Sequence, residues 1–216
     1  DYMRELTNHH VGGRLKVAPE HTDPKVLALM KKPTHDTFED FAAKFEAENR
    51  KAGKNQFLVP YFIASHPGSD LNAMIDLAVF LKRNGYKPDQ VQDFIPTPHD
   101  LATAMYYTGR DPQTGAEVPV AKGLKDRRLQ RALLQFFKPE NWFEVREALL
   151  KAGRKDLIGT GCDALIEPRA PMAALLARRA KANREAREDW TDAPPAAGKK
   201  GYRPARGSWG RRERKP

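Results

Sequence analysis

The chain has very little cysteine: Cys162 is the only one among 216 residues. A disulfide within the chain is therefore excluded, and so is a metal or iron–sulfur site built from several cysteines of this chain. A single thiol fits a reducing compartment, so we expect a cytoplasmic protein. Cys162 is a weak candidate nucleophile, because no histidine lies near it in sequence and a free cysteine is commonly a small buried hydrophobic residue.

Long apolar runs are also missing. No stretch approaches the roughly 18–20 residues needed to cross a bilayer, and no signal peptide is recognisable. We therefore expect no membrane contact. The sequence begins at Asp1 rather than at a methionine, in what reads as the end of a helix. We interpret it as a piece cut from a longer protein.

Excess positive charge is confined to one end of the sequence. Residues 178–216 hold 13 Lys and Arg against 5 Asp and Glu, so the other residues carry only two of the ten net positive charges. We expect residues 190–216 to be a disordered basic tail. Basic residues alternate with aromatic ones there, a pattern that can neutralise phosphates and stack on bases. The candidates for RNA contact are Lys199, Lys200, Tyr202, Arg203, Arg206, Trp209, Arg211 and Arg212. The alternative is a terminus that only aids solubility.

Three apolar segments separated by helical patterns predict an α/β fold. The predicted strands cover residues 14–18, 57–64 and 90–95. Helices are expected from Asp23, from about Thr34 to Gly53, and from Asp70 to Gly85, where capping residues and glycines mark the ends. Alternation of this kind implies parallel strands. The continuous apolar run 57–64 predicts a strand buried on both faces.

The pattern changes after residue 110. Helices are predicted over residues 100–107, 124–137, 141–152 and 171–189, with a loop or short strand at 157–168. We therefore expect three parts. Residues 1–110 form an α/β region, 111–189 a helical extension and 190–216 the basic tail.

A polar cluster containing a histidine follows each predicted strand. The clusters are residues 19–21, 65–69 and 96–100. In parallel α/β folds, ligands bind beyond the carboxyl ends of the strands, so these clusters are expected to face one crevice if the strands are neighbours. Taken singly, Glu20 is equally explained as an acid near a helix start, and His66 and His99 as ordinary loop residues.

Two other kinds of site would use the polar residues differently. A metal site would draw on His9, His10, His21, His66 and His99, but no pair of them has the i, i+4 spacing of a helical zinc site. A conventional barrel hydrolase or aldolase would need paired carboxylates, a metal triad or a Schiff-base lysine at the strand ends. Only Glu20 and Asp100 are acidic there, in different clusters. A third alternative is an RNA- or ribosome-binding module that acts through its tail.

Several blocks of sequence carry a family resemblance. Residues 15–30, 59–70 and 94–105 resemble successive strand exits of radical S-adenosylmethionine (SAM) proteins. The chain then continues through YYTGRDPQTG, FKPENW and LIGTGCDALI. Over about residues 1–170 it is similar to the YgiQ-type radical SAM family, in which a barrel is followed by a family-specific carboxy-terminal domain.

The resemblance implies a fold, cofactors and site residues. The fold is the last strands and helices of a partial TIM-like barrel, and the cofactors are SAM and a [4Fe–4S] cluster. In the full-length protein an electron donor is expected as a partner that reduces the cluster. The cluster motif CxxxCxxC is not in this sequence, so we expect it upstream and expect the piece alone to be inactive. On the SAM side the candidates are Glu20, Ser65, His66, Gly68 and Pro96. His21, Thr97 and His99 are substrate-side candidates. The substrate and the catalytic residues are left open.

Overall fold

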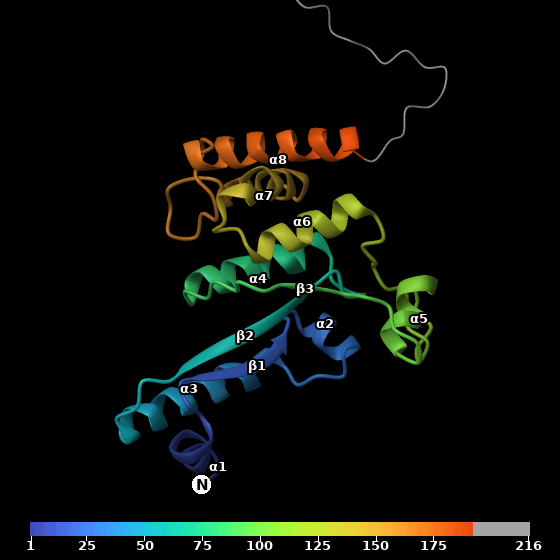
Figure 1. The fold of residues 1–216 in the computed structure, drawn as a ribbon. Coiled ribbons are helices and arrows are strands. Elements are labelled where there is room, and N and C mark those ends of the chain that lie inside the picture. Colours follow the sequence, from blue (N-terminus) through green and yellow to red (C-terminus); the bar gives the residue numbers. More distant parts are fainter. Residues whose placement is uncertain (192–216) are drawn as a thin grey trace, which may run out of the picture. The chain divides into compact units, whose positions relative to one another are not determined.

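The computed structural model describes the backbone of residues 1–191 and the side chains of residues 1–184. A short helix α1 (Tyr2–Glu5) and a π-helical turn η1 (Leu6–His10) precede the sheet. Strands β1 (Arg14–Glu20), β2 (Phe57–Ala64) and β3 (Gln92–Asp93) pair in the order β1-β2-β3, and both pairings are parallel (Figure 1). The fold is thus mixed α/β, as the alternation predicted. β3 is shorter than the predicted strand 90–95, because only Gln92 and Asp93 pair with β2.

Helices α2 (Pro24–Leu29), α3 (His35–Ala52) and α4 (Leu71–Arg83) make the connections between strands. Asp23 caps α2 by accepting hydrogen bonds from the backbone N–H groups of Lys25 and Val26, at 2.8 and 3.0 Å. Asp70 caps α4 in the same way through Ala73 N at 2.8 Å. These side chains satisfy amides that have no partner within a helix. The predicted helix starts are confirmed.

The two faces of the sheet differ. Pro60, Phe62 and Ala64 on β2 are buried on the face covered by α4. On the opposite face Val59, Tyr61 and Ile63 are only half-buried. Successive side chains of a strand point to opposite faces, so β2 is fully buried on one face alone. The prediction of burial on both faces is wrong for the described structure.

Helices dominate the rest of the chain. They are α5 (Leu101–Thr108), α6 (Leu124–Leu134), α7 (Trp142–Lys151) and α8 (Met172–Thr191), with short 3-10 turns η2 (Pro139–Asn141) and η3 (Lys155–Leu157). α6 ends three residues before the predicted 137. The predicted loop 157–168 holds one isolated bridge, between Ile158 and Ile166.

A single hydrophobic core joins elements from both sides of residue 110. Phe62 of β2 and Leu77 of α4 belong to the same buried cluster as Leu133 of α6 and Leu149 of α7. The chain separates into two compact units, residues 1–177 and residues 178–216. The core and the sheet lie in the first unit.

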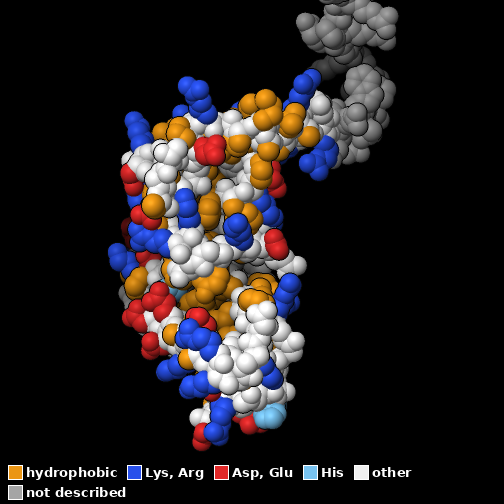
Figure 2. All heavy atoms as spheres, turned by 90° about the vertical axis from the view of Figure 1, so that its left-hand side faces the viewer, with side chains coloured by type: hydrophobic (Ala, Val, Ile, Leu, Met, Phe, Trp, Pro, Cys, Tyr) orange, Lys and Arg blue, Asp and Glu red, His pale blue; other side chains and the backbone are white. Residues whose placement is uncertain are grey.

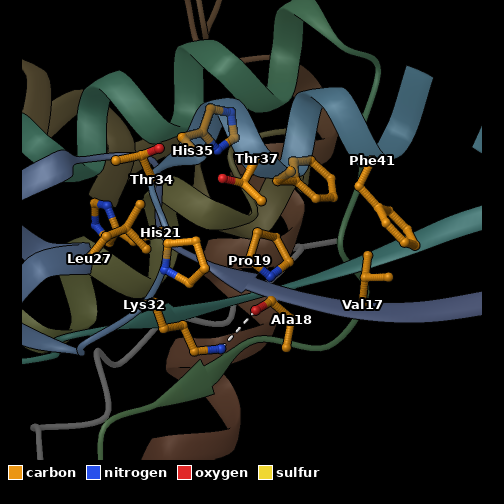
Figure 3. Close-up of a pocket in the computed structure, with 12 residues that line it drawn as sticks. Val17, Ala18, Pro19, His21, Leu27, Lys32, Thr34, His35, Thr37 and Phe41 are labelled. Atoms are coloured by element: carbon orange, nitrogen blue, oxygen red, sulfur yellow. Dashed lines mark hydrogen bonds between the residues drawn. The ribbon is translucent and has the colours of Figure 1, made fainter. Parts of the chain in front are cut away.

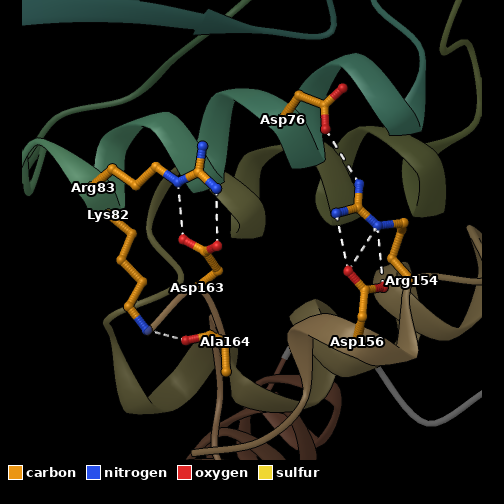
Figure 4. Close-up of polar contacts among 7 residues, drawn as sticks. All are labelled: Asp76, Lys82, Arg83, Arg154, Asp156, Asp163 and Ala164. Carbon is orange, nitrogen blue, oxygen red and sulfur yellow. Dashed lines mark hydrogen bonds and ion pairs between the residues drawn. The ribbon is translucent and has the colours of Figure 1, made fainter. Parts of the chain in front are cut away.

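Polar contacts fasten the segment after α7 to α4 (Figure 4). Arg83 donates two hydrogen bonds to the carboxylate of Asp163, each of 2.9 Å, and Lys82 donates to the carbonyl oxygen of Ala164. Arg154 reaches both Asp76 and Asp156. Bonding to Arg83 holds the pKa of Asp163 below its usual range. Exposed ion pairs stabilise a fold only weakly, so their role here is to fix the path of the segment.

Charges of both signs are mixed over the face seen in Figure 2, around a hollow in which hydrophobic side chains are visible. No strongly basic patch stands out in this view of the described residues. In the part of the chain that the structure covers, none of the helices has both the length and the apolar character to cross a membrane.

Candidate functional site: a cleft at the strand ends

The carboxyl ends of the strands border a cleft of about 530 Å³. Its walls include Glu20 from the end of β1, His66 from the loop after β2, and His99 and Asp100 from the loop before α5. A second hollow of about 720 Å³ shares His66 and Asp100 and extends to α6, where Arg127 and Arg131 line it. We call the two together the strand-end cleft. It brings Glu20, His66 and His99 together, as the predicted order of parallel strands required.

Unusual backbone conformations gather at this cleft. Among the described residues, the non-glycine positions with positive φ are Glu20 (66°), Lys31 (56°), Ser65 (64°) and His99 (65°). Glu20, Lys31 and His99 line the cleft, and Ser65 precedes His66. A left-handed backbone costs a side-chain-bearing residue about 1–2 kcal/mol. Strain of this kind is concentrated at functional sites, where the surrounding structure maintains it.

Glu20 is held in place by a lysine. Lys32 Nζ lies 3.2 Å from Glu20 Oε1 and donates a 2.8 Å hydrogen bond to the carbonyl oxygen of Ala18. The register between β1 and β2 shifts between Val17 and Glu20. Glu20 Oε2 has no hydrogen-bond partner in the described part of the chain. The carboxylate can therefore accept a further hydrogen bond from a ligand in the cleft.

His66 offers a second acceptor. Its Nδ1 lies 2.7 Å from the carbonyl oxygen of Pro67, which can only accept, so Nδ1 carries the proton. Nε2 is then unprotonated. Within the described part of the chain it has no partner, and it is not among the buried unpaired atoms. Burial lowers the pKa of His66, against the opposing effects of the Pro67 hydrogen bond, Asp100 and Glu20. The lowered pKa favours the neutral ring, in which Nε2 is an acceptor, and the residue lines the cleft.

His21 does not lie in the cleft. It is fully buried and lines an apolar pocket of about 290 Å³ beside β1 and α3, together with Leu27 and Phe41 (Figure 3). Nδ1 accepts from the N–H groups of Thr22 and Asp23, both at 3.0 Å, and Nε2 donates to Ser69 Oγ at 3.2 Å. Burial lowers the pKa of His21 to about 4. His21, predicted on the substrate side, therefore does not line the cleft. The backbone turns at Glu20, which has φ 66° and is spanned by a 2.8 Å hydrogen bond from His21 N to Pro19 O, so Glu20 lies in the cleft and His21 in the pocket.

The loop after β2 is fixed by its backbone. Gln130 of α6 is buried; its Oε1 accepts from Ser65 N and its Nε2 donates to Ser69 O, both at 2.9 Å. Gly68 has φ +94°, and a Cβ there would lie 2.4 Å from Leu29 Cδ1. Ser65 Oγ is buried without a partner. Neither Ser65 nor Gly68 lines the cleft, so both shape the loop that presents His66.

Pro96 and Thr97 lie on the loop between β3 and α5, outside the walls of the cleft. Thr97 N donates to Thr103 Oγ1 at 2.9 Å, and that hydroxyl donates back to Thr97 O at 2.7 Å. This pair of bonds fixes the loop that leads to His99. Pro96 was predicted on the SAM side and Thr97 on the substrate side, and neither residue lines the cleft.

The remaining candidates are placed elsewhere. Cys162 is exposed rather than buried. Within residues that the structure describes, no group of three His, Cys, Asp or Glu side chains could hold a metal ion, so the histidine metal site is not formed there. The candidates for RNA contact, residues 199–212, lie outside the described residues.

Sequence reasoning missed the residues that reach the site from a distance, namely Lys32, Arg127, Gln130 and Arg131. One signal for Gln130 was present. It lies between Leu129 and Ala132–Leu134 on a helix whose apolar residues are buried. A buried polar side chain needs a partner, so a glutamine in that stripe indicates a specific contact.

The second half of the chain matches a known protein family. Residues 89–209 match the family model described as Domain of unknown function (DUF3362). The match covers more than half of the chain. The chain belongs to the DUF3362 family. The DUF3362 region includes β3, α5, α6 and α7, and therefore the helix that supplies Arg127, Gln130 and Arg131.

Curated relatives extend the match to the first part of the chain. A UPF0313 protein of Clostridium botulinum (strain 657 / Type Ba4) is 55% identical over 166 residues, which is 77% of this chain and 26% of the relative. UPF0313 proteins of Clostridium perfringens (strain 13 / Type A) and Methanocella arvoryzae are 50% and 47% identical, over 76% and 79% of this chain and 25% and 28% of those relatives. UPF0313 is the YgiQ-type family, so the resemblance is confirmed at that level.

The chain spans about a quarter of the length of these relatives. No solved structure gives a match to the chain.

Proposed function

We propose that this chain is part of a radical SAM enzyme and forms the wall of its SAM site at the strand-end cleft. In the whole protein the sheet would be the last part of a partial TIM-like barrel. The single observation that carries the proposal is the convergence of Glu20, His66 and His99 at the carboxyl ends of parallel strands, where the backbone of Glu20, Ser65 and His99 is strained. Ligands bind at that edge in α/β folds.

The chemistry of the cleft fits SAM. The ribose hydroxyls, the α-ammonium group and the adenine amino group of SAM are hydrogen-bond donors. Glu20 Oε2 and His66 Nε2 are acceptors with no partner among the residues that the structure describes. The half-buried face of β2 borders the same region through Ile63. Glu20 would accept from hydroxyl or ammonium groups, and Lys32 would keep its carboxylate oriented.

The residues of this chain do not fit an iron–sulfur cluster. A [4Fe–4S] cluster needs several thiolates, and the chain has one cysteine. Under this proposal the cluster ligands come from another part of the protein. When bound together, the cluster and SAM supply a 5′-deoxyadenosyl radical. The residues described here bind and orient SAM and exclude water from it; no step through the cluster is assigned to them.

The test is made on the full-length protein, purified without oxygen, reconstituted with iron and sulfide, and supplied with SAM and a strong reductant. We expect 5′-deoxyadenosine, measured by liquid chromatography with mass detection. Glu20→Ala should weaken SAM binding about tenfold or more, since charge-assisted hydrogen bonds contribute roughly 1.5–3 kcal/mol. Glu39→Ala is the matched control, because Glu39 lies on α3 and does not line the cleft.

Two results would count against the proposal. One is a protein that carries its cluster, as judged by its absorbance and iron content, and yet releases no 5′-deoxyadenosine. The other is a SAM dissociation constant that Glu20→Ala leaves unchanged. The second result would leave the enzyme class possible and remove the strand-end cleft as the SAM wall.

A further inference from the structure

Arg127 stands out among the charged residues of the strand-end cleft. It lies in the first half of α6, in the DUF3362 region, and its side chain is half-buried. Its Nη2 donates a 2.6 Å hydrogen bond to the carbonyl oxygen of Phe94. In the described structure no carboxylate lies within ion-pair distance of it. The guanidinium is thus held in a fixed orientation with its charge not neutralised by a partner.

Its neighbour on the same helix face is different. Arg131 Nη1 lies 2.7 Å from Asp93 Oδ2, so the charge of Arg131 is already matched. Both arginines line the hollow next to His66. A guanidinium carries five N–H donors, and the bond to Phe94 uses one of those on Arg127. The others are available to a ligand, in the fork geometry that suits a carboxylate or a phosphate.

The other groups around this hollow define what a ligand must offer. His66 presents an unprotonated nitrogen, and Asp100 has one oxygen committed to Ala102 N at 2.9 Å. Both are acceptors, so the ligand needs donor groups on that side. Asp93 Oδ2 is paired with Arg131, and Asp93 Oδ1 is buried with no partner among the described residues, so it is a further acceptor for a donor group of the ligand. A small anion that also bears hydroxyl or amino groups matches this arrangement.

We infer that the α6 side of the strand-end cleft is an anion subsite in which Arg127 binds a carboxylate or phosphate of the ligand. The carbonyl of Phe94 orients the guanidinium, and His66 and Asp100 accept hydrogen bonds from neighbouring ligand groups. The anion can belong to a substrate or be the carboxylate of SAM, if the cleft binds SAM as proposed above. The chemistry at Arg127 is the same in both cases, and the two sources are separated by experiment.

The experiment is calorimetric titration of the full-length protein with three probes. They are inorganic phosphate, S-adenosylhomocysteine, which has the carboxylate of SAM, and 5′-methylthioadenosine, which lacks it. Arg127→Gln is compared with Arg128→Gln. Arg128 is the adjacent arginine on α6 and does not line the cleft. Its Nε lies 3.9 Å from Glu144 Oε1.

We expect Arg127→Gln to weaken binding of phosphate, S-adenosylhomocysteine or both by at least about tenfold, and Arg128→Gln to leave it unchanged. Weaker S-adenosylhomocysteine binding with unchanged 5′-methylthioadenosine binding identifies the carboxylate of SAM. Weaker phosphate binding alone identifies the anion of a substrate. Phosphate binding needs neither the cluster nor SAM. A result with phosphate therefore tests the anion subsite even if the protein forms no 5′-deoxyadenosine.

Three results would overturn the inference. Arg127→Gln could bind phosphate and S-adenosylhomocysteine as the wild type does, both arginine variants could weaken binding equally, or the wild type could bind neither probe. Should Arg127→Gln fold poorly, as judged by circular dichroism, Arg127→Lys replaces it. A lysine keeps the charge and loses the fork, so we expect a loss of about three- to tenfold; wild-type affinity in that variant would also contradict the subsite.

Discussion

In the strand-end cleft, Glu20, Lys31 and His99 adopt left-handed backbone conformations, and the acceptors Glu20 Oε2 and His66 Nε2 have no partner in the described structure. In the core between α4, α6 and α7, the side chains of Leu77, Leu133 and Leu149 are fully buried in regular helices. The backbone is locally strained in the strand-end cleft, whereas the backbone of these core residues is regular helix. Strained segments persist only when their surroundings determine them, so the core is what allows the cleft to keep its shape.

Helix α6 belongs to both regions. Its apolar residues, Leu129 and Leu133 among them, enter the core, while Arg127, Gln130 and Arg131 reach the loops after β2 and β3. The DUF3362 region therefore contributes both to the core and to one wall of the strand-end cleft. Changes in the core should therefore alter stability, and changes in the strand-end cleft should alter ligand binding.

The largest effect on stability is expected in the core. Leu133→Ala should lower the free energy of unfolding by about 3 kcal/mol, because it leaves a cavity at a fully buried position. Urea unfolding followed by circular dichroism measures this. Leu124→Ala, at an 88% exposed position of the same helix, is the control and should change stability by less than about 0.5 kcal/mol. Equal losses in the two variants would remove the distinction between core and surface of α6.

A pH-dependent effect of similar size is expected at His21. Its pKa is about 4 in the folded protein, against 6.5 for the unperturbed side chain. Between these values the unfolded chain takes up a proton that the folded chain does not. The free energy of unfolding should therefore fall as the pH drops from about 6.5 to 4, by about 3 kcal/mol, and this group should contribute no change above about pH 7.

The measurement is urea unfolding at several pH values for the wild type and for His21→Asn. Burial also lowers the pKa of His35 and His66, so their contributions have the same sign. The difference between the two proteins isolates His21. Should His21→Asn retain the full slope between pH 4 and 6.5, the buried neutral imidazole is not its source.

Much of this arrangement could be predicted from local sequence. The starts of α2 and α4 follow from Asp23 and Asp70, which cap them, and the parallel order follows from the alternation of strands and helices. The meeting of Glu20, His66 and His99 follows in turn from that order. These features depend on residues within a few positions of one another, or on a general rule of topology.

What could not be predicted depends on contacts between distant residues. Gln130 bonds to Ser65, 65 positions away, and no periodicity indicates which loop a buried glutamine meets. The two polar residues Glu20 and His21 look like one cluster in sequence, yet a register shift and a turn of the backbone at Glu20, with φ 66°, place Glu20 in the cleft and His21 in the pocket beside α3. β3 is short because only two of its residues find partners on β2.

A smaller effect separates two buried glutamines of similar chemistry. Gln130→Ala leaves Ser65 N and Ser69 O without their partner, and Gln135→Ala does the same to the carbonyl oxygens of Pro88 and Asp89. Each should cost about 1–3 kcal/mol of stability. Only Gln130→Ala should also weaken binding of S-adenosylhomocysteine or phosphate, because only Gln130 holds the loop that carries His66. An equal loss of ligand binding in both variants would mean that the loss results from lower stability and not from the loop that carries His66.

The smallest effect, and the only gain, is expected at Lys31. This residue follows the end of α2 with φ 56°, its N–H donates to Ala28 O, and the next amide, of Lys32, donates to Leu27 O. Glycine is preferred at this position of a helix end because it has no Cβ. Lys31→Gly should raise the free energy of unfolding by about 0.5–1 kcal/mol in urea unfolding. Gly53→Lys, at the left-handed end of α3, is the reverse control and should lower it by about 1 kcal/mol. A Lys31→Gly variant with unchanged stability, beside a destabilised Gly53→Lys variant, would mean that the backbone at Lys31 is not strained. The contrast between a strained cleft and a relaxed core would then rest on Glu20, Ser65 and His99 alone.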